Sequence, residues 1–193
     1  MKRMLIIGPP GSGKGTQAER LSASLGVAPI STGYIFRANV RDRTPLGVAA
    51  AAYLDNGDLV PDEITNAMVR SRLGEDDARE GFLLDGYPRT VAQVEELDDI
   101  LAGHGQELDL VLQLSAGDEE LVRRLLGRAK DAGRSDDTEK VIRHRLALYH
   151  GQTEAVLTRY AERGQLVRVD GFGAVDTVSE RVLRATTLTS GRR

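Results

Sequence analysis

A glycine-rich segment near the amino terminus has the composition of a phosphate-binding loop. Residues 8–16 read Gly-Pro-Pro-Gly-Ser-Gly-Lys-Gly-Thr and stand between the apolar run Met4–Ile7 and a helical stretch. Glycines let backbone N–H groups approach a phosphate without Cβ clashes, and the start of the following helix adds a partial positive charge. Lys14 supplies a compact cation for the terminal phosphates. The segment indicates nucleotide binding, with a Gly-rich strand–helix turn as the purely structural alternative.

A second segment can bring a carboxylate and an arginine to the same site. The apolar run Phe82–Leu84 ends in Asp85, where a carboxylate can hold Mg²⁺ or its water shell beside phosphates, unless it only forms a turn. Pro88 has a fixed φ and biases Tyr87 toward extended conformations, which directs Arg89 back over the strand edge. A planar guanidinium there can bind a phosphate through two hydrogen bonds.

Five further arginines fall near expected strand ends or around a polar segment after residue 128. Any one of them alone is most simply a solvated surface charge. Their joint placement favours a site that neutralises the charge of several phosphates. These residues are Arg37, Arg124, Arg128, Arg134 and Arg145.

The type of phosphate acceptor follows from the side chains that are missing. Transfer to a neutral hydroxyl benefits from a carboxylate base, whereas a phosphate oxygen is already ionised and needs none. Such an acceptor instead needs cations that reduce the repulsion between two anions. Several arginines with one evident metal carboxylate therefore favour an acceptor that carries phosphate. A GTPase is disfavoured because no Asn-Lys-x-Asp segment occurs, while the loop alone leaves an ATPase or a sulfotransferase open.

Apolar strands and amphipathic helices alternate along the chain and must position these residues. The alternation predicts an α/β fold with a parallel sheet and helices on both faces, in which ligands bind at the carboxyl edge. Two stretches exceed what crossovers require, residues 31–73 and 128–137, and we expect both to lie over that edge. Strands are expected at residues 4–7, 27–30, 82–84, 108–114 and 166–169, and helices at 15–25, 33–40, 46–56, 62–73, 91–102, 118–128, 138–163 and 175–188.

The composition limits the class of protein. The 193 residues are 40% hydrophobic and 28% charged, which fits one globular core. A net charge of −3 argues against nucleic-acid binding by bulk electrostatics, and the absence of cysteine excludes disulfides and thiolate zinc sites. No apolar run approaches the ~20 residues of a membrane span, and no signal-peptide pattern is present. We therefore expect a cytoplasmic enzyme with no membrane or nucleic-acid partner.

Together these segments resemble the adenylate kinase family of nucleoside monophosphate kinases, almost from end to end. Gly8–Thr16 is similar to the family's Gly-x-Pro-Gly-x-Gly-Lys-Gly-Thr form, which accounts for Gly15 where the general loop has Ser or Thr. The Asp-Gly-Tyr-Pro-Arg segment at residues 85–89 is highly specific. The other matching segments are Ser31-Thr32-Gly33, Gly57-x-Leu59-Val60-Pro61, Arg124-x-x-Gly127-Arg128 and Gly133-Arg134-x-Asp136-Asp137.

The resemblance implies a fold and an activity. The fold is of the P-loop NTPase type, with three αβα layers, a five-stranded parallel sheet, a helical insertion at residues 31–60 that binds the nucleoside monophosphate, and a short lid at residues 129–136. The activity is reversible, Mg²⁺-dependent transfer of the ATP γ-phosphoryl group to AMP, giving two ADP, by a monomer. Longer family members carry a large lid, sometimes with zinc, for which residues 128–134 leave no room.

The resemblance also implies roles for individual residues. Asp85 would reach Mg²⁺ through water, and Arg124 would lie against the ATP adenine. The ATP site would comprise Pro10, Gly11, Ser12, Gly13, Lys14, Gly15, Thr16, Arg124, Arg128 and Gly173. The AMP site would comprise Thr32, Arg37, Val60, Gly86, Arg89, Gln93, Arg134 and Arg145. The catalytic groups would be Lys14, Arg89, Arg128, Arg134 and Arg145.

One departure from the family pattern bears on activity. The family usually has an acidic residue after Ser-Thr-Gly, whereas this chain has Tyr34, which offers no carboxylate. Either Mg²⁺ hydration depends more on Asp85 or the AMP-binding insertion packs differently. A paralogue with reduced activity, or one that only binds nucleotide, is therefore an alternative.

Other acceptors define further alternatives. A UMP or CMP kinase on the same fold is the nearest, but Gln93 can bond an adenine edge through its amide and Thr32 stands in the matching place, so AMP is favoured. A small-metabolite kinase is disfavoured for want of a general base. Three histidines and a tyrosine are expected outside the site, the histidines without a metal role: His104, His144, His150 and Tyr149.

Overall fold

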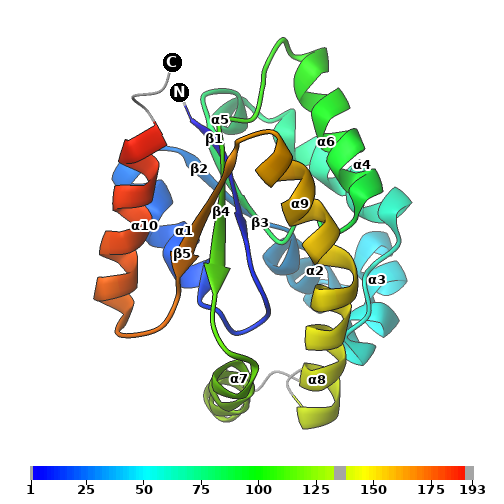
Figure 1. Ribbon diagram of the computed structural model, residues 1–193. Helices are drawn as coiled ribbons and strands as arrows, with labels where there is room; N and C mark the ends of the chain where they lie inside the picture. The colour runs from blue at the N-terminus through cyan, green and yellow to red at the C-terminus, as the bar shows by residue number, and fades with distance from the viewer. Residues whose placement is uncertain (1, 133–137, 190–193) are drawn as a thin grey trace.

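A five-stranded parallel sheet forms the centre of the molecule (Figure 1). This computed structural model describes residues 2–132 and 138–189. The strand order is β2-β3-β1-β4-β5, with every neighbouring pair parallel, which confirms the predicted fold class. The strands are β1 (Arg3–Ile7), β2 (Ala28–Ser31), β3 (Phe82–Asp85), β4 (Leu110–Ser115) and β5 (Leu166–Asp170).

Helices cover both faces of the sheet. Figure 1 shows α1 (Lys14–Leu25) and α10 (Val175–Thr189) on one face, and α4 (Asp62–Leu73), α6 (Val91–Gly103) and α9 (Glu154–Glu162) on the other. Side chains alternate between the faces of a strand, and both faces of this sheet are buried. In β1, Met4 and Ile6 accordingly pack with α1 and α10, whereas Leu5 and Ile7 pack with the opposite layer.

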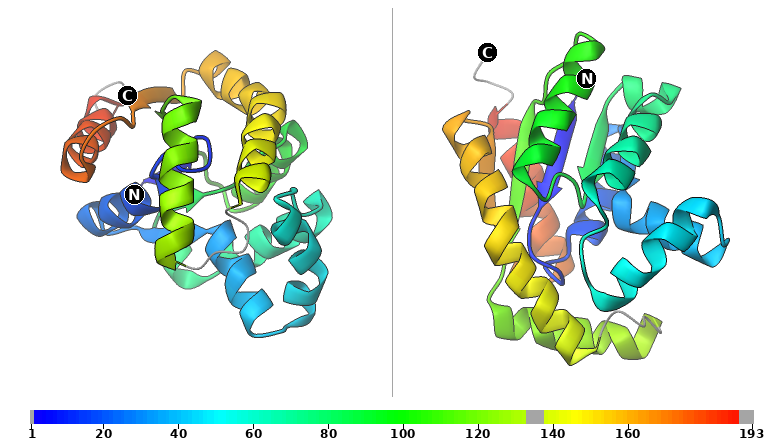
Figure 2. Two further views of the ribbon diagram at one scale, coloured as in Figure 1. Left: turned by 90° about the horizontal axis from the view of Figure 1, so that it is seen from below. Right: turned by 90° about the vertical axis from the view of Figure 1, so that its right-hand side faces the viewer.

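A further group of helices gathers at the carboxyl ends of the strands. Viewed from that end, α7 (Asp118–Ala132) lies across the sheet, with α8 (Glu139–Leu148) and the pair α2 (Thr32–Arg41) and α3 (Pro45–Asn56) to one side (Figure 2). The strand register aligns three strand ends beneath them, because Asp85 pairs with Ile6 on one side and with Ser31 on the other. This edge is where an open α/β sheet binds its ligands.

The structure differs from the sequence prediction in three local features. The long helix expected at residues 138–163 is divided by a π-helical turn, η1 (Tyr149–Thr153), and periodicity cannot reveal one extra residue per turn. Helix α5 (Asp76–Arg79) has four residues and is too short for a periodic pattern. Helix α7 continues to Ala132, past the expected end at residue 128 and into the first residues of the expected lid, whereas residues 133–137 lie outside the described chain.

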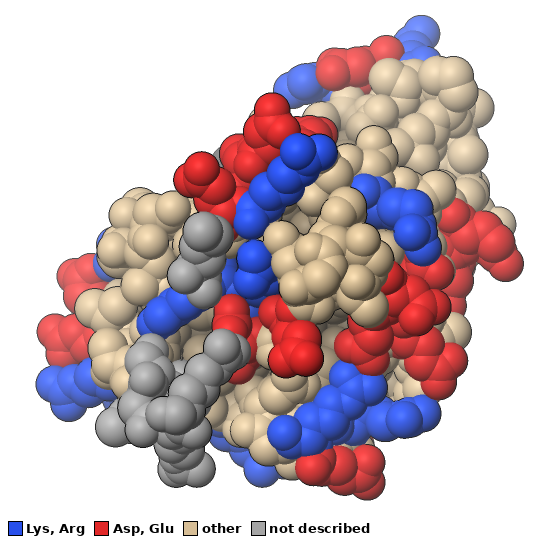
Figure 3. Space-filling view, turned by 90° about the horizontal axis from the view of Figure 1, so that it is seen from above, with Lys and Arg blue, Asp and Glu red and all other residues tan. Residues whose placement is uncertain are grey.

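Acidic and basic side chains are mixed on the surface at the amino ends of the strands. Figure 3 shows acidic and basic residues next to one another on this face. Arg79 pairs with Asp76 in α5, and Arg72 at the end of α4 pairs with Asp77. None of the helices in the described ranges is long and apolar enough to cross a membrane.

Leu112 on β4 tests how far the central core determines stability. Its side chain is fully buried, so Leu112→Ala removes apolar contacts and leaves a cavity. We expect the free energy of unfolding in urea to fall by about 2–5 kcal/mol. Leu183→Ala on the exposed side of α10 is the control and should change it by less than about 0.5 kcal/mol. Equal losses in the two variants would contradict the assigned core.

Candidate active site

The segment between β1 and α1 forms an open loop ahead of the helix. Gly11 and Gly13 have positive φ angles of 84° and 90°, which glycine adopts without steric cost. Gly13 precedes α1, and no side chain caps the first N–H groups of that helix. These N–H groups therefore have the arrangement of an anion-binding helix start.

The loop is fixed from beneath by β4 and α7. A Cβ at Gly8 would collide with the Leu114 carbonyl oxygen, and one at Gly11 would come within 2.9 Å of Leu125 Cγ. Glycine is thus required at both positions by close approach of neighbouring elements. A larger residue at either position would displace the loop or its neighbour on β4 or α7.

Lys14 is a cation held among other cations. Its Nζ donates to the Pro9 carbonyl oxygen at 2.8 Å. Burial lowers the pKa of Lys14 to about 8; Asp85 opposes this change, and the charges of Arg89, Arg145 and Arg128 add to it. Three cationic side chains from separate elements therefore lie close enough to act on the Lys14 ammonium group.

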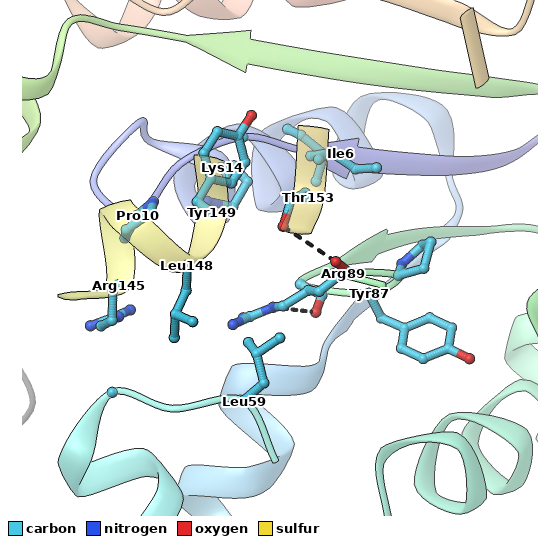
Figure 4. A pocket seen from close by; sticks show the side chains of 15 residues that line it. Ile6, Pro10, Lys14, Leu59, Tyr87, Arg89, Arg145, Leu148, Tyr149 and Thr153 are labelled. Carbon is cyan, nitrogen blue, oxygen red and sulfur yellow. Dashed lines mark hydrogen bonds between the residues drawn. The ribbon is translucent and has the colours of Figure 1, made fainter. Parts of the chain in front are cut away.

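Arg89 is held in place from both its backbone and its side chain. Arg89 Nε donates to the Gly86 carbonyl oxygen at 2.8 Å (Figure 4). The Thr153 hydroxyl donates to the Arg89 carbonyl oxygen at 3.4 Å. Burial lowers the pKa of Arg89, Arg145 lowers it further, and Asp85 opposes the change. The peptide bond between Tyr87 and Pro88 just before it is cis.

Two adjoining hollows meet at these arginines. The first contains Pro10 and Lys14 of the loop, and the second contains Thr32 and Arg37 of α2. Figure 4 shows the Arg89 guanidinium pointing into the first hollow, on the side where Arg145 and Leu148 lie. The residues that line both hollows are Gly57, Leu59, Gly86, Arg89 and Arg145. Two anionic ligands could thus approach the same pair of cations.

Asp85 presents an oxygen that nothing in the described chain satisfies. The Ser31 hydroxyl donates to Oδ2 at 3.4 Å, whereas Oδ1 is buried with no hydrogen-bond partner among the described residues. The described residues contain no group of three or more His, Cys, Asp or Glu side chains that could hold a metal ion directly. A single carboxylate fits a hydrated Mg²⁺ bound through water. The Tyr34 side chain is 68% exposed and supplies no second carboxylate.

Helix α7 and the loop after β5 meet beside the phosphate-binding loop. Arg124 donates through Nε to Glu120 Oε1 at 2.7 Å, as an ion pair, and through Nη1 to the Gly171 carbonyl oxygen at 3.2 Å. A Cβ at Gly171 would lie 3.2 Å from the Ser12 carbonyl oxygen. Gly173 follows with a φ of 118°. Residues expected at the ATP site from three distant segments are therefore neighbours.

The floor of the second hollow is closely packed. Gly86 has a φ of 87°, and a Cβ there would lie 2.5 Å from the Thr32 hydroxyl oxygen. Gln93 is 2% exposed, and Val60 is also buried. A carbonyl, a hydroxyl and an amide are thereby brought to one wall, the composition expected of a pocket for a heteroaromatic base.

The expected site residues within the described ranges gather around the two hollows and the phosphate-binding loop. Arg134 lies outside the described residues. Sequence reasoning missed Leu59 and Thr153, and placed Tyr149 in the core alone, although Tyr149 also lines the first hollow. Arg145, Tyr149 and Thr153 are spaced by four residues, and this spacing could have revealed them as one face.

Two of the histidines expected outside the site have acidic partners in space. His144 Nε2 lies 2.7 Å from Asp58 Oδ1, which joins α8 to the segment after α3. His150 lies between Glu154 and Asp118, and these carboxylates raise its pKa, Glu154 most strongly. Both histidines are exposed.

Lys14 of the phosphate-binding loop lies near arginines that line both hollows. This arrangement is typical of one class of enzyme, the nucleoside monophosphate kinases. Residues 6–165 match the family described as Adenylate kinase, and the chain belongs to this family. It is 69% identical over 185 residues to an adenylate kinase of Pseudarthrobacter chlorophenolicus and 67% identical to one of Renibacterium salmoninarum, covering 96% of both chains in each case. An adenylate kinase of Thermobifida fusca is 55% identical over 95% of this chain and 97% of its own.

The lowered pKa of Lys14 makes anion binding depend on pH. Sulfate does not titrate in this range, and it binds the protonated ammonium. We expect the sulfate Kd from calorimetry to be constant below pH 8 and to rise up to about tenfold per pH unit above it, with proton uptake on binding. Lys14→Met should bind weakly at every pH, and Lys140→Met, on the exposed start of α8, should behave as the wild type. A Kd that stays constant up to pH 10, near the ordinary lysine pKa, would contradict the assignment.

Proposed function

We propose that the protein transfers the γ-phosphoryl group of ATP reversibly to AMP, giving two ADP. The observation that carries the proposal is that Arg89 and Arg145 line both hollows, one beside the phosphate loop and one beside α2. Donor and acceptor can then share the same cations during transfer. Membership of the adenylate kinase family and the names of the relatives support the same activity.

The donor is assigned to the first hollow. The uncapped N–H groups at the start of α1 and Lys14 would hold the ATP phosphates, with Arg128 near the same charges. Arg124 would lie against the adenine, where it already joins α7 to the Gly171 carbonyl oxygen. The loop residues from Pro10 to Thr16, together with Gly173, complete the proposed ATP site.

The acceptor is assigned to the second hollow. Arg37 and Arg89 would bind the AMP phosphate, and Thr32, Gln93 and the backbone of Val60 and Gly86 would surround its base. A phosphate oxygen of AMP attacks the γ-phosphorus in line, and the bond from that phosphorus to the bridging oxygen of ADP breaks. Arg145 and the other shared cations stabilise the charge that develops on the transferring group.

The site fits Mg²⁺ bound through water at Asp85, whose buried Oδ1 is available to accept from such water. When bound, the ion would neutralise phosphate charge and orient the donor. Because Tyr34 offers no carboxylate, we assign the hydration shell chiefly to Asp85 and the Ser31 hydroxyl bonded to it. We propose no zinc site, since the chain has no cysteine.

We further propose that residues 31–60 move as an AMP-binding domain and residues 129–136 as a short lid, of which 133–136 lie outside the described chain. The first segment contacts α8 in this structure. A Cβ at Gly57 would come within 2.7 Å of Val141 Cγ1, and Asp58 pairs with His144. Closure would exclude water that otherwise hydrolyses ATP. We expect a cytoplasmic monomer with no nucleic-acid or membrane partner.

A coupled assay with ATP, Mg²⁺ and AMP tests the proposal. We expect ADP formation by the wild type, with kcat/KM for AMP above that for CMP or UMP. Arg89→Ala should lower kcat/KM by about 10³-fold or more, because an arginine on the transferring group contributes on that scale. Arg184→Ala, on the exposed side of α10, should leave it unchanged. Folded wild-type protein that forms no ADP would end the proposal.

A further inference from the structure

Asp62 joins the start of α4 to the start of α6 beside the second hollow, without lining that hollow. It is the first residue of α4 and follows Val60-Pro61. Its Oδ2 accepts from the Thr90 hydroxyl at 2.9 Å and its Oδ1 accepts from Gln93 Nε2 at 2.6 Å. Both carboxylate oxygens are therefore used within the protein.

The opposite side of the Gln93 amide is also held. Its Oε1 accepts from the Arg89 backbone N–H at 2.7 Å. A backbone N–H can only donate and an ionised carboxylate can only accept, so these two partners determine which end of the amide is oxygen and which is nitrogen. A flipped amide would place its NH₂ group against the Arg89 N–H and its oxygen against the Asp62 carboxylate. Gln93 is only 2% exposed, so water could not relieve these contacts.

The held amide keeps a defined hydrogen-bonding capacity toward the hollow. Nε2 has a second hydrogen and Oε1 has a second lone pair, in a fixed order. A freely rotating amide could match a base edge in either order, whereas a fixed amide matches one. Adenine presents an acceptor at N1 beside a donor at the 6-amino group, and hypoxanthine presents a donor at N1 beside an acceptor at O6. The two purines differ in this order and are otherwise alike in shape.

We propose that Asp62 is a positioning residue that fixes the orientation of the Gln93 amide and thereby makes the second hollow select adenine over hypoxanthine. The inference rests on the proposed function, because it takes Gln93 to face the base of the acceptor monophosphate. The same amide bonds the Arg89 backbone, so recognition of the base and placement of the phosphate-binding arginine belong to one hydrogen-bonded chain.

The test compares kcat/KM for AMP with that for IMP, the nucleoside monophosphate whose base is hypoxanthine, in the wild type and in Asp62→Ala. We expect the wild type to favour AMP strongly. In Asp62→Ala the ratio of kcat/KM for AMP to that for IMP should fall by roughly ten- to a hundredfold, the effect of losing a hydrogen bond to a charged group. The KM for AMP should rise while the KM for ATP stays unchanged. Asp62→Asn keeps a carbonyl oxygen for Gln93 Nε2 and should retain most of the ratio.

Glu63→Gln is the matched control, because it removes one negative charge from the same first turn of α4 at an exposed side chain. It should keep the wild-type ratio. An Asp62→Ala protein with an unchanged ratio, or with the KM values for AMP and ATP raised together, would overturn the inference and leave Asp62 a structural residue. A Glu63→Gln protein that loses the ratio equally would also overturn it.

Calorimetric Kd values for AMP and IMP separate this inference from the proposed function. If the wild type binds AMP but forms no ADP, the function fails, and the Kd ratio still decides whether Asp62 sets base selection. If Asp62→Ala fails to fold, Asp62→Ser replaces it in the test. Its hydroxyl is too short to reach both Thr90 and Gln93, so we expect the same fall in the AMP to IMP ratio. A wild-type ratio in the folded serine variant would overturn the inference.

Discussion

Mutual repulsion among cations is the constraint on which the site depends. Lys14, Arg89 and Arg145 come from three separate elements; Arg89 and Arg145 lower the pKa of Lys14, and Arg145 lowers the pKa of Arg89. Asp85 acts on both Lys14 and Arg89 and opposes these shifts. The free energy of folding therefore holds charges together that anionic phosphates would stabilise. A preformed field of this kind needs little reorganisation when the ligands arrive.

The parallel sheet explains how distant segments reach this cluster. Strands β2, β3 and β1 end in register, which places Ser31, Asp85 and the phosphate loop beside one another. Helix α7 then crosses the same edge and packs on the loop through Leu125, while α8 brings Arg145 from the other side. Gly8, Gly11 and Gly86 permit these approaches, because a Cβ at each would overlap a neighbouring element.

The sequence predicted the sheet because the buried strands are continuous apolar runs. It predicted nearly all the helices because several begin at capping residues such as Ser31 and Thr138, whose side chains accept a hydrogen bond from the backbone N–H three residues on. It also predicted the loop, Asp85 and the arginines as candidates. It did not predict η1, whose extra residue leaves no periodic signature, nor the partners of His144 and His150, which depend on which helices become neighbours. Asp62 was likewise hidden, since its role arises from contacts with residues about thirty positions away.

The π-helical turn η1 constrains how this chain can vary in length. Thr153, its last residue, bonds the backbone of Arg89, and the helices on either side place Arg145 at the two hollows and Tyr160 in the core. Successive residues of a helix are offset by about 100°, so a one-residue deletion here would turn every later side chain of α9 by that angle relative to α8. Either the guanidinium or the buried ring would then face the wrong way. Insertions and deletions should consequently be tolerated on the outer loops and excluded from this turn.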